Sequence, residues 1–79
     1  MRILLFAQLR DAAAREKFEW PGAGPWTADQ LWQRLLAECP VLAAHRPAVR
    51  LARNGEYAAP DTMFCDGDEV ALIPPVSGG

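Results

Sequence analysis

The pattern of apolar residues predicts two strands, one near each end of the chain. Residues 2–9 hold the run Ile3-Leu4-Leu5-Phe6-Ala7, which is apolar on both faces of an extended backbone. Residues 69–73 (Glu-Val-Ala-Leu-Ile) repeat the pattern, and Pro74-Pro75 ends it because proline cannot donate to a strand ladder. Strands that are apolar on both faces usually lie inside a sheet, so we expect these two to be its central neighbours.

The middle of the chain carries the strongest helix signal. Thr27 and Gln30 have the spacing of a capping box, in which each side chain bonds the backbone N–H of the other residue. We expect one main helix over about 28–39, ended by the proline that follows. Its apolar stripe has helical spacing and consists of Leu31, Trp32, Leu35, Leu36 and Cys39. Residues 10–16 predict a short helical turn, and residues 41–47 fit either another turn or a loop.

Three shorter strands complete the expected sheet. Residues 17–20 and 49–53 alternate between polar and apolar side chains, as half-buried strands do. Asn54-Gly55 predicts a hairpin, since a type I′ turn needs positive φ at both central residues, and residues 56–58 form its short return strand. This order of elements predicts an α+β roll, in which the main helix lies across one face of a mixed sheet.

One helix covers one face of such a sheet and leaves the other face without cover. With Ile3 and Leu5 turned toward the helix, strand alternation turns their neighbours away from it. The residues expected on the uncovered face are Leu4, Phe6, Ala71, Ile73 and, from the hairpin, Tyr57. An exposed apolar patch of this kind usually marks a partner surface. A loop of the same chain folded over the patch is the alternative.

The composition excludes several classes of protein. The 79 residues allow one domain, and a formal net charge of -2 offers no electrostatic footprint for nucleic acid. The longest apolar run is far shorter than the roughly 20 residues that cross a bilayer, so we expect no membrane segment. Cys39 and Cys65 lack metal-ligand spacing and fit reduced thiols of a cytoplasmic protein. His45 has no catalytic neighbour in the sequence. With no metal-ligand spacing and no glycine-rich phosphate loop, we expect neither a metal site nor a bound cofactor.

The net charge conceals an uneven distribution. Residues 1–55 hold all eight Lys and Arg and five acids, a net of +3, whereas residues 56–79 hold five acids and no Lys or Arg, a net of -5. We therefore expect an acidic surface beside the end of the chain, which could steer a basic partner over roughly 8–10 Å. A solvated polar loop is the alternative interpretation.

The last six residues, Pro74 to Gly79, carry the most specific chemistry. Fully extended, they reach roughly 20 Å beyond the last strand. Gly78 and Gly79 have no Cβ and can thread a narrow channel, and Gly79 ends in a carboxylate that is ionised at neutral pH. Once a nucleotide-dependent enzyme adenylates that carboxylate, its carbonyl reacts with a thiol, an amine or a sulfide. We expect a domain over 1–75 and a flexible tail over 76–79.

The two ends of the chain resemble the small subunit of molybdopterin synthase, a MoaD-type sulfur carrier of the ubiquitin-like β-grasp family. Residues 3–10 are similar to that family's first strand and the turn after it, and residues 66–71 and 74–79 to its last strand and tail. Asn54 stands where the family often has asparagine in the hairpin. Residues 16–48 match in pattern only. The resemblance implies a β-grasp roll whose first and last strands are parallel.

The resemblance also implies a mechanism and its partners. An adenylating enzyme related to ubiquitin-activating enzymes (MoeB-type) would use ATP to activate Gly79, which then becomes a thiocarboxylate, while Gly78 lets the tail thread. The sulfur would pass to cyclic pyranopterin monophosphate inside the large synthase subunit (MoaE-type) and form the dithiolene of molybdopterin. The catalytic groups would belong to that large subunit, so this chain would be a carrier. The implied partner-binding residues are Phe6, Tyr57, Ile73, Pro75, Val76 and Ser77.

Three other functions share the fold or the activated carboxylate. A thiamine-pathway sulfur carrier has the same Gly-Gly end, although such carriers are usually shorter and lack the Pro-Pro-Val before it. A ubiquitin-like protein modifier would link Gly79 to lysines of other proteins, and Lys17 is the only lysine on which chains of this modifier could grow. A plain interaction module with incidental glycines is the third. The oligomer count and the identity of the activating enzyme stay open.

Overall fold

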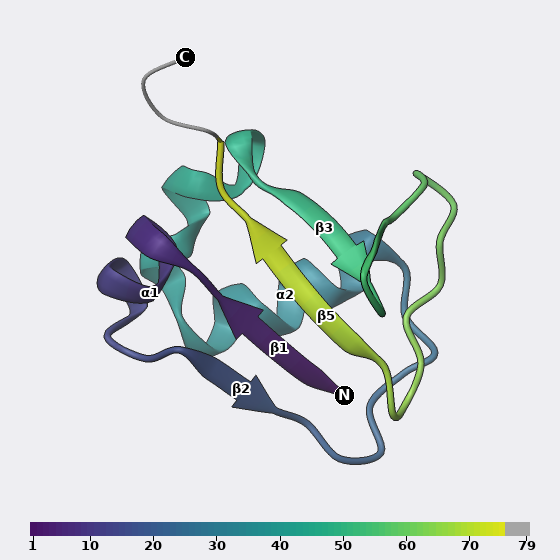
Figure 1. Cartoon of the computed structure of the whole chain (residues 1–79). Coiled ribbons are helices and arrows are strands. Elements are labelled where there is room, and N and C mark those ends of the chain that lie inside the picture. Colours follow the sequence, from purple (N-terminus) through teal and green to yellow (C-terminus); the bar gives the residue numbers. More distant parts are fainter. Residues whose placement is uncertain (76–79) are drawn as a thin grey trace.

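A five-stranded mixed sheet with one long helix across a single face forms the framework of the chain (Figure 1). The computed structural model describes residues 1–75. The strands are β1 (Arg2–Leu5), β2 (Lys17–Glu19), β3 (Arg50–Arg53), β4 (Glu56–Tyr57) and β5 (Glu69–Ile73). The helices are α1 (Ala7–Ala13), α2 (Ala28–Glu38) and the 3-10 helix η1 (Pro40–Ala48).

The parallel pair β1 and β5 occupies the centre of the sheet. The strands lie in the order β2-β1-β5-β3-β4, and every neighbouring pair except β1 and β5 is antiparallel. In the view of Figure 1, α2 lies behind the sheet, and no helix lies over the front face. The arrangement confirms the expected α+β roll of the β-grasp type, with the first and last strands central and parallel.

The hydrophobic core lies between the sheet and the helices. Its strand residues are Ile3, Leu5, Val70 and Leu72, each no more than 2% exposed. From α2, Leu31, Trp32 and Leu35 pack into the same cluster. Full burial of an aliphatic side chain of this size contributes about 1.5–3 kcal/mol, so these contacts hold the helix to the sheet.

The start of α2 confirms the predicted capping box. The Thr27 hydroxyl accepts the backbone N–H of Gln30 at 3.2 Å, and the Gln30 side-chain oxygen accepts the N–H of Thr27 at 2.9 Å. Two N–H groups that the first turn would otherwise leave unpaired are satisfied in this way. The helix ends at Glu38, immediately before Cys39 and Pro40.

The first strand is shorter than its apolar pattern predicts. It ends at Leu5, and α1 begins at Ala7, whose φ is +48°. The backbone N–H of Leu9 donates to the carbonyl of Phe6 at 3.0 Å, and Leu9 is fully buried in the helix rather than in a strand. The residues of α1 are mostly strong helix formers, and a short apolar run does not distinguish a buried helix from a buried strand.

Residues 40–48 are more ordered than a single turn or a loop. They form η1, in which Pro40 takes the first position, where its missing N–H is no loss. Leu42 is fully buried in the core and anchors this segment. The return strand of the hairpin is also slightly shorter than predicted, since β4 ends at Tyr57.

A close crossing of two loops fixes the approach to α2. Trp26 and Phe64 exchange two backbone hydrogen bonds, each 2.8 Å long. Beside them, Gly24 has a φ of +96°, and a Cβ placed on it would lie 2.5 Å from the carbonyl oxygen of Phe64. Gly22, in the same loop, has a φ of +74° but nothing within 4 Å of such a Cβ.

We expect Gly24→Ala to destabilise the fold more than Gly22→Ala. Both variants carry the cost of a left-handed alanine, about 1–2 kcal/mol, and Gly24→Ala adds a clash of the kind that costs about 1–3 kcal/mol in packed interiors. Urea unfolding of the two variants and the wild type measures the difference in free energy. Equal losses in both variants would show that the loop crossing relaxes freely.

Candidate functional site

The candidate site is the end of β5 and the sheet face beside it. β5 leads out of the sheet centre through Ile73, Pro74, which is half-buried, and Pro75, which is exposed. The predicted tail residues Val76, Ser77, Gly78 and Gly79 lie outside the described residues. Their roles, and the division into a domain over 1–75 and a tail over 76–79, therefore stay predictions.

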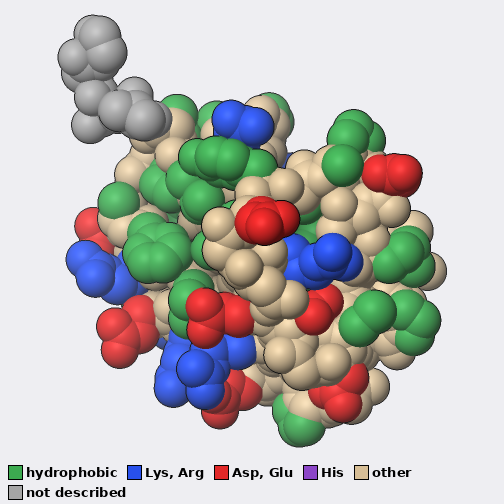
Figure 2. Space-filling model, turned by 45° about the vertical axis from the view of Figure 1, so that its right-hand side comes forward, with side chains coloured by type: hydrophobic (Ala, Val, Ile, Leu, Met, Phe, Trp, Pro, Cys, Tyr) green, Lys and Arg blue, Asp and Glu red, His purple; other side chains and the backbone are tan. Residues whose placement is uncertain are grey.

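The outer face of the sheet, defined here as the face turned away from α2, is apolar next to this exit. Phe6 is 46% exposed and Tyr57 is 58% exposed, while Leu4, Ala71 and Ile73 are half-buried. Figure 2 shows hydrophobic side chains gathered beside the point where the described chain ends. Because Phe6 and Tyr57 are exposed, the alternative that a loop of the chain covers them is wrong. The alternation along the strands correctly predicted which residues share this face.

Strand register explains why these residues lie together. Leu4 is paired with Ala71, Ala71 with Ala52, and Ala52 with Tyr57, so one row of side chains crosses four strands. Directly paired residues turn to the same face of a sheet. Phe6 continues the alternation of β1 in an extended conformation, with φ -125° and ψ 155°. The structure therefore brings Phe6, Tyr57 and Ile73 to one face and leaves their role as partner contacts a prediction.

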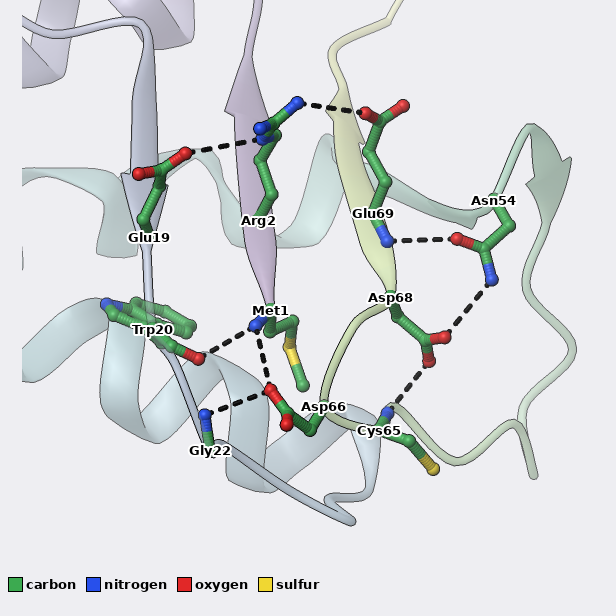
Figure 3. A network of polar contacts seen from close by, with 10 residues as sticks. All are labelled: Met1, Arg2, Glu19, Trp20, Gly22, Asn54, Cys65, Asp66, Asp68 and Glu69. Atoms are coloured by element: carbon green, nitrogen blue, oxygen red, sulfur yellow. Dashed lines mark hydrogen bonds and ion pairs between the residues drawn. The ribbon is translucent and has the colours of Figure 1, made fainter.

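A polar cluster holds the other end of β5 (Figure 3). Asp68 accepts hydrogen bonds from the backbone N–H of Cys65 at 2.8 Å and from the Asn54 side chain at 3.1 Å. Asn54 in turn accepts the N–H of Glu69 at 2.9 Å. Asp66 accepts the N–H of Gly22 at 2.9 Å and lies 3.6 Å from the Met1 ammonium. The cluster ties together the hairpin turn, the loop that follows β2 and the start of β5.

These contacts shift the ionisation of one carboxyl group. The backbone N–H of Cys65 is the largest cause and holds the pKa of Asp68 below its usual value. Partial burial opposes that shift, and the hydrogen bond from Asn54 and the charge of Arg53 act with it. A hydrogen bond to the charged form favours the charged form, so ionised Asp68 stabilises the fold.

The acidic residues do not lie where the charge count along the chain suggested. Asp66, Asp68 and Glu69 stand at the start of β5, whereas the tail follows its end. The five residues of β5 separate these two points, and a strand rises about 3.3 Å per residue. These three acids therefore do not form the expected acidic surface beside the point where the tail leaves β5; they serve the turn that starts the strand.

Other residues noted in the sequence have structural surroundings. Trp20 is 3% exposed, and its ring centroid lies 5.7 Å from that of Phe18 and 5.8 Å from that of Trp26. Cys39 and Cys65 are free thiols, half-buried and exposed respectively. Within residues 1–75, no three His, Cys, Asp or Glu side chains are grouped so as to hold a metal ion. No helix in that range combines the length and the apolar character needed to cross a membrane.

The fold and the sequence together define the protein class. A mixed sheet with parallel β1 and β5 at its centre and α2 across one face is the ubiquitin-like β-grasp architecture. The model of the ThiS family matches residues 3–79. The chain therefore belongs to the ThiS family, and its recognition as similar to the MoaD-type sulfur carriers is confirmed.

Two curated relatives and two solved structures illustrate the likeness. The molybdopterin synthase sulfur carrier subunit of Chlamydomonas reinhardtii is 40% identical and that of Escherichia coli 33%, each over 100% of this chain and 98% or 99% of its own. The crystal structure of SAMP1 from Haloferax volcanii has a TM-score of 0.82 and 31% identity, covering 99% of this chain and 97% of that one. A complex of subunits 1 and 2 of the Helicobacter pylori molybdopterin-converting factor, with 23% identity, a TM-score of 0.62 and full coverage of both chains, supports the fold.

The lowered pKa of Asp68 gives the stability a predictable pH dependence. Because the folded-state pKa is depressed, the contribution is complete above the unfolded value of about 3.9 and is lost as the pH falls through the folded value. We expect Asp68→Asn to be less stable than the wild type at pH 7, with a difference that shrinks toward pH 2. Denaturant unfolding across that range measures it. Asp61→Asn, at an exposed position, is the control, and a difference for Asp68→Asn that stays constant with pH would contradict the assignment.

Proposed function

We propose that this chain is the sulfur carrier subunit of a molybdopterin synthase. The observation that carries the proposal is a match that runs along the whole chain to Gly79. The family model covers residues 3–79, and relatives named for this function are matched over 98–99% of their own length. A Gly-Gly end that follows Pro74-Pro75 after two further residues, Val76 and Ser77, is the part of the sequence suited to carry a reactive group into another protein.

Activation takes place on the Gly79 carboxylate. Inside an adenylating partner related to ubiquitin-activating enzymes, a carboxylate oxygen attacks the α-phosphorus of ATP, a C–O–P link forms and pyrophosphate leaves. Sulfur at the oxidation level of sulfide then attacks the carbonyl carbon, a C–S bond forms and AMP leaves. The product is a thiocarboxylate on Gly79. The use of ATP fits the cytoplasmic location that we propose for this reaction.

The thiocarboxylate then enters the large subunit of the synthase. There the sulfur passes to cyclic pyranopterin monophosphate, water returns the oxygen to the carbonyl carbon, and Gly79 is again a carboxylate. The acid–base groups for this transfer belong to the large subunit.

The outer sheet face is the docking surface in this proposal. Phe6, Tyr57 and Ile73 contact the large subunit, and Pro75, Val76 and Ser77 follow them into its channel. The exposure of two aromatic side chains supports this role, since Tyr and other aromatic residues dominate the energetics of protein interfaces. The face adjoins the end of β5, so docking there points the tail at the partner.

A second candidate function is conjugation to other proteins. It is favoured by the likeness to SAMP1, described for the same species as small archaeal modifier protein 1. The activated carboxylate would be the same, and the nucleophile would be a lysine amine in place of sulfide. The lone lysine, Lys17, is exposed on the edge strand β2.

Intact-mass measurement tests the sulfur-carrier proposal. After incubation with the adenylating enzyme, ATP and a sulfur donor, we expect the chain to gain the mass difference between one sulfur and one oxygen atom. Removal of Gly78 and Gly79 should abolish this gain and leave the unfolding transition in place, because the sheet and core precede Val76. An unchanged mass contradicts the proposal, and Gly79 found in an isopeptide bond supports the modifier function.

We expect Phe6→Glu to weaken binding of the large subunit by about 30-fold or more, the loss seen when a central interface side chain is removed. Phe6 is 46% exposed, so the monomer should stay folded. Isothermal titration with the large subunit measures the affinity. Val41→Glu, on η1 and 52% exposed, is the matched control and should bind normally. Unfolding of the Phe6→Glu monomer would place the side chain in the core instead.

A further inference from the structure

An arginine lies on the outer sheet face at the end next to the tail. Arg50 is paired with Ile73, the last residue of β5, and Tyr57 is paired with Ala52. Paired residues share a face, and a long side chain reaches its diagonal neighbour on the next strand, so Arg50 meets Tyr57. Its guanidinium carbon lies 4.1 Å from the centroid of the Tyr57 ring, well inside the about 6 Å range of cation–π attraction.

Arg50 differs from the arginine at the other end of the same face. Arg2 lies 3.4 Å from Glu19 and 3.8 Å from Glu69, so its charge is matched by two carboxylates. The remaining ion pairs within residues 1–75 involve Met1, Lys17, Arg34 and Arg46, and none includes Arg50. The outer face is therefore neutralised at the start of β5 and carries a positive charge at its end.

This charge matters once a partner covers the apolar residues around it. Docking removes water from Arg50, and a desolvated charge without a partner is strongly unfavourable. The Tyr57 ring lies against the guanidinium of Arg50, whose N–H groups enter no ion pair within residues 1–75. Those groups match the geometry of a carboxylate, which can accept two parallel hydrogen bonds from them.

We infer that Arg50, held on Tyr57, is a specificity-determining residue of this surface and that the large subunit presents an Asp or Glu carboxylate to it. The inference rests on the proposed function, since it takes the large subunit as the occupant of the outer face. The continuity of the patch with the exit of the tail argues for that occupant, because Arg50 is paired with Ile73 at the end of β5. The positive charge of Arg50 makes a carboxylate the matching group.

Titration of the large subunit with the full chain tests this inference. We expect Arg50→Gln to weaken binding by about 30-fold or more, the lower bound for removing one partner of a buried charge pair. Arg2→Gln removes the same charge at the opposite end of the face and should bind within about twofold of the wild type, as a surface ion pair contributes little. Arg50→Glu should lose more than Arg50→Gln, and reversal of one Asp or Glu of the large subunit to Arg should restore much of that loss. Unfolding midpoints confirm that the variants are folded.

The outcomes separate the inference from the proposed function. A wild-type chain that does not bind the large subunit at all overturns both. Wild-type binding with an equally tight Arg50→Gln variant overturns the inference alone. Equal losses in Arg50→Gln and Arg2→Gln also overturn it, because net charge would then explain the effect. Failure of every charge reversal to rescue Arg50→Glu contradicts the partner carboxylate.

Discussion

The parallel pairing of β1 with β5 is the constraint on which the rest of the structure depends. Adjacent parallel strands cannot be joined by a tight turn, so nearly the whole chain lies between them and supplies α2, η1 and the hairpin. The pairing sets Leu5 against Leu72. Both strands therefore end at the same side of the sheet, and the exit of the tail lies beside the start of α1 and the start of β3.

The pairing also gives the two faces of the sheet different roles, one as the core and the other as an exposed surface. Ile3, Leu5, Val70 and Leu72 face α2 and form the core. Their neighbours along both strands face outward, where no helix of residues 1–75 covers them. A sheet that is apolar on both faces but covered on one is stable as a monomer only if the outward patch stays modest. Leu4, Ala71 and Ile73 on that face are half-buried, which limits the exposed apolar area.

The features that depend on residues close together in the sequence were predictable from it. The features that depend on the register between distant strands were not. The capping box, the Asn54-Gly55 turn and the alternation along β1 and β5 act between near neighbours, so their residue types determine the outcome. Leu9 was assigned to a strand because a short apolar run fits both structures. The predicted position of the acids was wrong because β5 is extended: residues only a few positions before the tail in the sequence lie at the opposite end of the strand. Arg50 was not identified from the sequence, although the hairpin turn contains the information needed to do so. A two-residue turn sets Arg53 opposite Glu56 and Ala52 opposite Tyr57. This register makes Arg50 a diagonal neighbour of the Tyr57 ring.

The apolar patch and the charge of Arg50 contribute differently to the recognition of a partner. Burial of apolar area favours any complementary surface and discriminates poorly between partners. A charge that must be desolvated penalises every partner that lacks a matching group, so it discriminates between partners. With a matched partner, removing the charge weakens binding because it leaves the partner's carboxylate buried and unpaired. The polar cluster at the start of β5 keeps the acids Asp66 and Asp68 bound to the fold, away from the outer face at its other end. Arg50 thus stands without a neutralising neighbour among the described residues, which is what allows a single side chain to select between partners of the tail.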